Sequence, residues 1–235
     1  MATKRSKDRV VGRLVARAGT PSLIEIEGLT EVADRIGRDL LAAFLKCFEG
    51  IDRLLSLEDL LVLNNKLEPS SPIRYTRNLR LLVRSLGATM YEVAEALQEL
   101  CWARVVEKMT DRDLWDPVNE LRGRWRGDPR LASLRNELGF HLGKIELYRT
   151  GLLKLLDVGE DHVFAKRDGD LRHEGEFSIA SECLTVGHGM SLDDHREITD
   201  MTWEAHSELP DQLFLVWVDV LKTAGIEVTD ESQVP

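Results

Sequence analysis

Three residues with chemically useful side chains lie close together in the segment SLRNELGFHLGK, residues 133–144. They are Arg135, Asn136 and His141. Histidine titrates near neutral pH, so it can donate or accept a proton during a reaction. A guanidinium group is planar and binds phosphate oxygens in a forked geometry. These residue types are therefore suited to acid–base chemistry on a phosphate group, provided that the fold brings them together.

The sequence predicts a long helix around these residues. Asp128 and Pro129 suit the N-cap and the first helical position, and a ladder of apolar residues at helical spacing follows. Arg135 precedes His141 by six residues, which places it about 120° away around an ideal helix, on the flank of the ladder. One helix alone therefore does not aim both groups at one point, whereas two such helices packed face to face would bring four polar groups together. The ladder consists of Leu131, Leu134, Leu138, His141, Ile145, Tyr148, Leu152 and Leu155.

The order arginine, small polar residue, histidine on a helix resembles the signature of the HEPN superfamily (higher eukaryotes and prokaryotes nucleotide-binding). The resemblance is confined to this motif and its helical setting, about residues 72–156. It implies an all-helical bundle that dimerises and cleaves RNA without a metal or cofactor, with the ribose 2′-OH as nucleophile. It also implies His141 as general acid or base, Arg135 as the group that stabilises the phosphorane-like charge, and Asn136 as the residue that positions them.

Many HEPN-like proteins are bacterial toxins or phage-defence proteins. The resemblance therefore implies a homodimer as the working form, RNA as substrate, and a cognate antitoxin or another protein as a partner. The competing hypothesis is a noncatalytic helical module that binds RNA or protein, in which the motif is structural. His141 would then be a core histidine with a satisfied hydrogen bond, and Arg135 an ordinary solvated helix residue.

The same pattern occurs a second time, at Arg167, Asp168 and His173. This second match lies in a glycine-rich segment whose natural interpretation is a surface loop. The first match is preferred because it lies on a helix beside apolar positions, where burial can tune a titratable group.

A row of arginines on the preceding helix predicts an RNA-binding face. Four of them are spaced three, three and four residues apart, so they fall within about 120° of one helix face. The segment LRGRWRGDPR adds further arginines and Trp125, an aromatic side chain available for stacking. The alternative is an ordinary solvated surface whose arginines pair with nearby glutamates. The arginines predicted to bind RNA are Arg74, Arg77, Arg80, Arg84, Arg126 and Arg130.

The distribution of charge agrees with a basic first part of the chain. The net charge is −10, but residues 157–235 hold 5 Lys and Arg against 19 Asp and Glu, while residues 1–156 hold 26 against 22. No Walker-type loop, Rossmann glycine fingerprint, Gly-x-Ser-x-Gly elbow or Cys-x-x-Cys pair occurs. A zinc or iron site is conceivable around His195 and His206, or around Cys183, His188 and Asp194, but none of these spacings is diagnostic. No metal or cofactor is therefore predicted.

The predicted fold class is mainly α, a HEPN-like helical bundle with a short irregular or β-hairpin insertion near 159–189. Residues 1–29 form an N-terminal arm, 30–225 a single helical domain with that insertion, and 226–235 a C-terminal tail. The segment SLIEIEG in the arm suits either a short strand or a helix lead-in. Ser191 is the expected cap of the last helical stretch, which Pro210 should kink or restart and Gly225 should end.

Three widely spaced cysteines suit free thiols in a reducing compartment. No run of apolar residues is long enough to cross a membrane. The expected location is therefore the cytoplasm, with no membrane partner.

Overall fold

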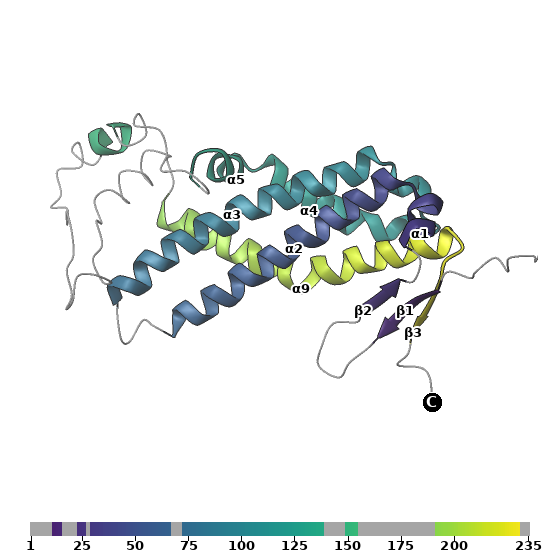
Figure 1. Cartoon of the computed structure of the whole chain (residues 1–235). Coiled ribbons are helices and arrows are strands. Elements are labelled where there is room, and N and C mark those ends of the chain that lie inside the picture. Colours follow the sequence, from purple (N-terminus) through teal and green to yellow (C-terminus); the bar gives the residue numbers. More distant parts are fainter. Residues whose placement is uncertain are drawn as a thin grey trace, which may run out of the picture. The chain divides into compact units, whose positions relative to one another are not determined.

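The computed structural model describes residues 11–15, 23–26, 29–66, 72–138, 149–154 and 191–230. Most of these residues are helical, which confirms the mainly α helical bundle (Figure 1). The helices are α1 (Leu29–Ile36), α2 (Arg38–Asn65), α3 (Pro72–Trp102), α4 (Trp115–Gly127), α5 (Pro129–Ser133) and α9 (Leu192–Thr223), with short 3₁₀ turns at Val105–Lys108 and Arg112–Leu114. Residues 149–154 are also helical. Within the described ranges, no helix combines the length and apolar character that crossing a bilayer requires.

The chain divides into two compact units. Unit 1 comprises Met1–Phe48, Ala96–Glu120 and Leu209–Pro235, and unit 2 comprises Glu49–Glu95 and Leu121–Glu208. Helices α2, α3 and α9 contribute residues to both units. The described residues among those predicted to bind or cleave RNA belong to unit 2.

Unit 1 contains a small sheet with the strand order β2-β1-β3. Strand β1 (Val11–Val15) pairs antiparallel with β2 (Leu23–Ile26) and parallel with β3 (Glu227–Asp230). Of the two alternatives for SLIEIEG, the structure has the strand. A strand of the predicted N-terminal arm, β1, therefore pairs in the sheet with a strand of the predicted C-terminal tail, β3. The predicted insertion at 159–189 lies outside the described residues.

Helix α9 begins and ends as local sequence signals predict. Ser191 caps its start, because Ser191 Oγ accepts a hydrogen bond from the backbone N–H of Asp194 at 3.1 Å. At the other end Gly225 has a φ of 73°, and the N–H of Ile226 reaches back to the carbonyl of Leu221 at 2.9 Å, which is a Schellman motif. Of the two outcomes predicted for Pro210, a kink or a restart of the helix, the restart does not occur, since α9 continues through that residue. Proline has no backbone N–H, so one helical hydrogen bond is missing at this position. The side chains of Leu209 and Leu213 are fully buried, and their packing stabilises the helix there.

Helix α3 supplies the central stripe of the core of unit 2. Val83, Leu86, Met90 and Val93 are all buried. The helix ends at Trp102, because Arg104 adopts a left-handed conformation with a φ of 57°. Only glycine or an adaptable residue suits such a position well, so the turn interrupts an otherwise helical pattern.

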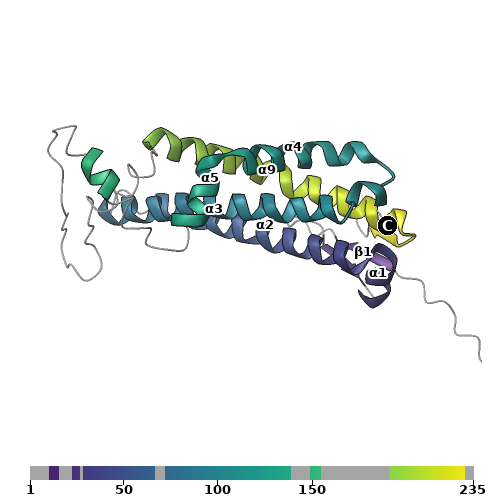
Figure 2. The same cartoon turned by 90° about the horizontal axis from the view of Figure 1, so that it is seen from above.

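Gly87 lets two other segments approach α3 closely. A Cβ atom at this position would lie 2.4 Å from Leu134 Cδ1 and 3.5 Å from Ile198 Cγ2 of α9. One turn further along, Thr202 Oγ1 of α9 lies 3.2 Å from Met90 Sδ of α3. Residue numbers rise together on the two helices, so α3 and α9 run parallel here, as Figure 1 and Figure 2 both show.

Candidate functional site

The capped helix α5 directly precedes the candidate motif in the chain. Asp128 is its N-cap, since Asp128 Oδ1 accepts a hydrogen bond from the N–H of Arg130 at 2.8 Å, and Pro129 follows at the start of the helix. Both predictions for these residues are confirmed. Leu131 and Leu134 are fully buried, in agreement with the first two positions of the predicted ladder. Packing therefore fixes the backbone just before Arg135.

The motif itself begins on a π-helical turn, Leu134–Leu138. The prediction of a regular α-helix through these residues is wrong. A π turn bonds each N–H to the carbonyl five residues back, so the angle of about 120° calculated for Arg135 and His141 does not apply. Single π turns inside helices are frequent at functional sites. Residues 139–148, which include His141, lie outside the described residues, so the meeting of Arg135 with His141 stays a prediction.

Arg135 and Asn136 are both exposed and joined to each other. Arg135 Nη1 donates to Asn136 Oδ1 at 2.9 Å, and Arg135 Nε lies 3.9 Å from Glu92 Oε1 of α3. A guanidinium group carries five N–H donors, so it can bind an anion in addition to the asparagine. About half of the Arg135 side chain, 48%, is exposed. The pair is therefore oriented by an internal hydrogen bond and accessible to a ligand from solvent.

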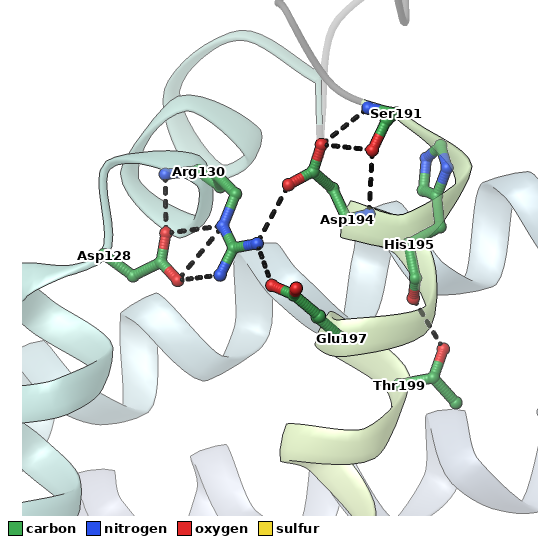
Figure 3. Close-up of polar contacts among 7 residues, drawn as sticks. All are labelled: Asp128, Arg130, Ser191, Asp194, His195, Glu197 and Thr199. Carbon is green, nitrogen blue, oxygen red and sulfur yellow. Dashed lines mark hydrogen bonds and ion pairs between the residues drawn. The ribbon is translucent and has the colours of Figure 1, made fainter.

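Arg130, predicted to bind RNA, is held by three carboxylates of the protein (Figure 3). Its guanidinium lies 2.7 Å from Asp128 Oδ2 and 2.9 Å from Asp194 Oδ1, and it also pairs with Glu197. Hydrogen bonds to Asp128, then to Glu197 and Asp194, raise the pKa of Arg130. A phosphate would have to compete with these three carboxylates for the guanidinium group. The contacts favour a structural role for Arg130, in which it links the start of α5 to the start of α9.

The other predicted RNA-binding arginines have different surroundings. Arg126 Nε donates to Glu95 Oε1 at 2.7 Å, which is the kind of pairing that the alternative interpretation expects. Arg74 and Arg77 lie on α3, but their side chains are outside the described part of the structure. Arg80 and Arg84 are half-buried on α3 and close enough to His195 to perturb its titration.

His195 belongs to this basic cluster, which the sequence does not reveal. Burial lowers the pKa of His195, the positive charges of Arg84 and Arg80 lower it further, and Asp194 opposes them. His195 Nε2 is buried and has no hydrogen-bond partner within the described ranges. In the sequence His195 stands out only as a conceivable metal ligand, because nothing local shows that α3 and α9 lie side by side.

The metal alternative finds no support in the described residues, among which no group of three or more His, Cys, Asp or Glu is placed to hold an ion. Cys183 and His188 lie outside those residues, as does the side chain of His206. Cys47 is buried, and burial, with Glu99 adding to the effect, raises the pKa of its thiol to about 12. This thiol therefore stays protonated and is not a candidate nucleophile.

Comparison of the chain with protein-family models, with curated proteins and with solved structures finds no match. Chemically, the described residues offer an exposed, pre-oriented Arg135–Asn136 pair and, separately, two arginines beside a half-buried histidine. Both arrangements are suited to binding oxyanions such as phosphate.

Proposed function

We propose that this protein is a HEPN-like endoribonuclease that cleaves RNA without a metal ion, with Arg135, Asn136 and His141 as its motif. The observation that carries this proposal is the hydrogen bond between Arg135 and Asn136 on an exposed π turn. That bond presents a guanidinium in a fixed orientation at the surface. A pre-oriented cation stabilises a transition state better than a mobile one, because little reorganisation is needed when negative charge develops.

In the proposed reaction the ribose 2′-oxygen attacks the adjacent phosphorus. A 2′,3′-cyclic phosphate forms as the bond from phosphorus to the 5′-oxygen breaks, and that oxygen takes up a proton. His141 acts as the general base that removes the 2′-OH proton, or as the general acid that protonates the 5′-oxygen. Arg135 binds the nonbridging oxygens as their negative charge grows, and Asn136 Oδ1 keeps the guanidinium in place.

The working form in this proposal is a homodimer in the cytoplasm. One motif supplies a single histidine, whereas cleavage with both a base and an acid needs two, and a second subunit related by a two-fold axis supplies the other. The free thiol of Cys47 agrees with a reducing compartment. A toxin or phage-defence role, with an antitoxin or another protein as partner, belongs to the same proposal.

The second candidate function is a noncatalytic helical module that binds RNA or protein. It is favoured by the contacts of Arg135 with Asn136 and Glu92, and by the pairing of Arg126 with Glu95. A purely structural motif would make the same contacts. The two functions predict different effects of mutating the motif. Replacing a structural arginine lowers the stability of the protein, whereas replacing a catalytic arginine lowers the rate of cleavage.

The test is RNA cleavage by the purified protein in EDTA, compared with Arg135→Ala and His141→Ala. A histidine that transfers protons contributes about 10²- to 10⁴-fold to a rate, so His141→Ala should lose at least that much. Arg196→Ala is a matched control, because Arg196 is an exposed arginine that, among the described residues, pairs with Asp193 of its own helix. If both motif variants cleave as fast as the parent protein, or if EDTA abolishes cleavage, the proposed nuclease is wrong.

A further inference from the structure

A cavity of about 480 Å³ lies between α2 and α3 in unit 2. Arg53 Nη1 of α2 lies 3.9 Å from Glu92 Oε2 of α3. Asn64, further along α2, donates at 3.1 Å to the backbone carbonyl of Tyr75, which comes earlier on α3. The two helices therefore run antiparallel beside the cavity, whose volume is in the usual range for ligand pockets. Its lining consists of Glu49, Asp52, Arg53, Ser56 and Leu57 of α2 and Ser85 and Thr89 of α3.

Two polar side chains of this lining are available to a ligand. The carboxylate of Asp52 and the hydroxyl of Thr89 make no hydrogen bond or ion pair within the described ranges. Thr89 is only 5% exposed, so packing holds it in place, and the cavity is where its hydroxyl can find a partner. A largely buried hydroxyl without a partner costs free energy, which a bound ligand can recover.

The charges around the cavity favour a neutral ligand over a phosphate. Arg53 is the cation among the described lining residues, and it pairs with Glu49 and with Glu92. A phosphate in the cavity would lie near Asp52, whose charge no described residue balances, and like charges repel. A neutral ring with N–H donors suits these acceptors better, and the half-buried Leu57 offers it an apolar surface.

Glu92 connects the cavity to the Arg135 motif. One oxygen of its carboxylate lies 3.9 Å from Arg53 Nη1, and the other lies 3.9 Å from Arg135 Nε. Given the width of a carboxylate, the two guanidinium nitrogens are no more than about 10 Å apart. A single ribonucleotide has comparable dimensions, so a phosphate bound at Arg135 can bring a neighbouring base to the cavity.

We infer that this cavity binds a guanine base, with Asp52 accepting hydrogen bonds from its N1–H and N2–H groups and Thr89 donating to its O6. Among the four RNA bases, guanine presents two adjacent N–H donors beside a carbonyl. A carboxylate can accept from both donors together, and a hydroxyl can serve the carbonyl. That the guanine belongs to RNA rests on the proposed function, because it uses the position of Arg135. Free guanine nucleotides offer the same chemistry, and the experiment separates the two sources.

The experiment measures the binding of fluorescently labelled oligouridylates by anisotropy. All their riboses are 2′-O-methylated, so that they cannot be cleaved, and one position holds guanosine, inosine, adenosine or cytidine. The parent protein should bind the guanosine oligomer about tenfold or more tightly than the adenosine and cytidine oligomers. Inosine, which lacks the N2 amino group, should be intermediate.

Asp52→Asn should remove the preference for guanosine, because an amide accepts hydrogen bonds at only one of its two outer atoms. Asp59→Asn is the matched control, since Asp59 is an exposed acid of the same helix that does not line the cavity. This variant should keep the preference. Thr89→Val, which removes the hydroxyl at nearly constant volume, should weaken binding of the guanosine oligomer about threefold or more. If Thr89→Val fails to fold, Asp52→Asn decides, because Asp52 is exposed.

Competition with guanosine 5′-monophosphate identifies the source of the base. Displacement of the guanosine oligomer by this nucleotide at similar concentrations indicates a free guanine nucleotide, whereas displacement by guanosine-containing RNA alone indicates RNA. Arg135→Ala should keep the preference for guanosine even if it abolishes cleavage, so failure of the proposed nuclease leaves this result intact. Equal affinity for the four oligomers, or a preference that survives Asp52→Asn, overturns the inference.

Discussion

Arg130 of α5 and Asp194 of α9 are joined by a hydrogen bond of 2.9 Å, although they are 64 residues apart in the sequence. Asp128 and Glu197 complete the group around the same guanidinium. This cluster links the helix that leads into the Arg135 motif to the helix that carries His195. We therefore expect its loss to disturb the backbone that leads into the Arg135 motif.

Replacing Arg130 with alanine should destabilise the protein. The side chain of Asp128 is only 11% exposed, so removal of the guanidinium would leave a largely buried carboxylate without its ion pair. The expected loss in the free energy of unfolding is about 1–3 kcal/mol. Urea denaturation of Arg130→Ala measures it, with Arg196→Ala as the exposed control, for which a change within about 0.5 kcal/mol is expected. Equal losses in the two variants would show that the cluster contributes no more to the free energy of unfolding than an exposed ion pair does.

Acid should weaken the same cluster through Asp194. The N–H of Ser191, and then the side chain of Arg130, lower the pKa of Asp194 from its ordinary value of 3.8 to about 2. A carboxylate with a lowered pKa contributes stability above its unfolded pKa, and that contribution is lost as the pH falls from about 4 toward 2. The free energy of unfolding of the parent should therefore fall more steeply over this range than that of Asp194→Asn. Parallel curves would contradict the assignment.

Two glycine substitutions should have opposite effects on stability. Alanine at Gly87 would place its Cβ 2.4 Å from Leu134 Cδ1, whereas alanine at Gly123 would meet no atom within 4 Å. Overpacking costs about 1–3 kcal/mol, while an unhindered glycine to alanine change inside a helix gains about 0.5–1 kcal/mol. Thermal unfolding should show a lower Tm for Gly87→Ala and a higher one for Gly123→Ala. A stabilised Gly87→Ala protein would rule out the close packing of Leu134 on α3.

Asn136→Ala should affect cleavage without affecting folding. Asn136 is exposed, so the expected change in the free energy of unfolding is within about 0.5 kcal/mol. The guanidinium of Arg135 would lose the acceptor that orients it, which should lower kcat by about tenfold with little change in KM, since the interaction is needed mainly in the transition state. The contrary result, a large loss of stability with unchanged kcat, would favour the structural motif of the noncatalytic alternative.

Three helix ends were predictable from the sequence, but the relations between helices were not. The caps at Asp128, Ser191 and Gly225 depend on hydrogen bonds within a few residues, so residue type and spacing suffice to find them. The π turn that begins at Leu134 has no such local signal, and it occurs where Leu134 packs on Gly87 of another helix.

The same distinction separates the two candidate sites. Arg135 and Asn136 were found by their spacing, because they are neighbours in the sequence. His195 lies near Arg80 and Arg84 because α3 and α9 run parallel in one particular register. Arg130 meets Asp194 through a different pair of helices, α5 and α9. Such a register is set by the shapes of packed side chains far apart in the chain, which hydrophobic spacing alone does not specify.

The chemical ends of the RNA products test the central claim most directly. RNA incubated in EDTA with the parent protein, and separately with His141→Ala, is analysed by mass spectrometry. Attack by the 2′-oxygen predicts fragments that end in a 2′,3′-cyclic phosphate and begin with a 5′-hydroxyl, formed by the parent and reduced at least about 10²-fold in His141→Ala. Fragments that begin with a 5′-phosphate, or equal amounts of cyclic phosphate from both proteins, would contradict a metal-independent nuclease built on this motif.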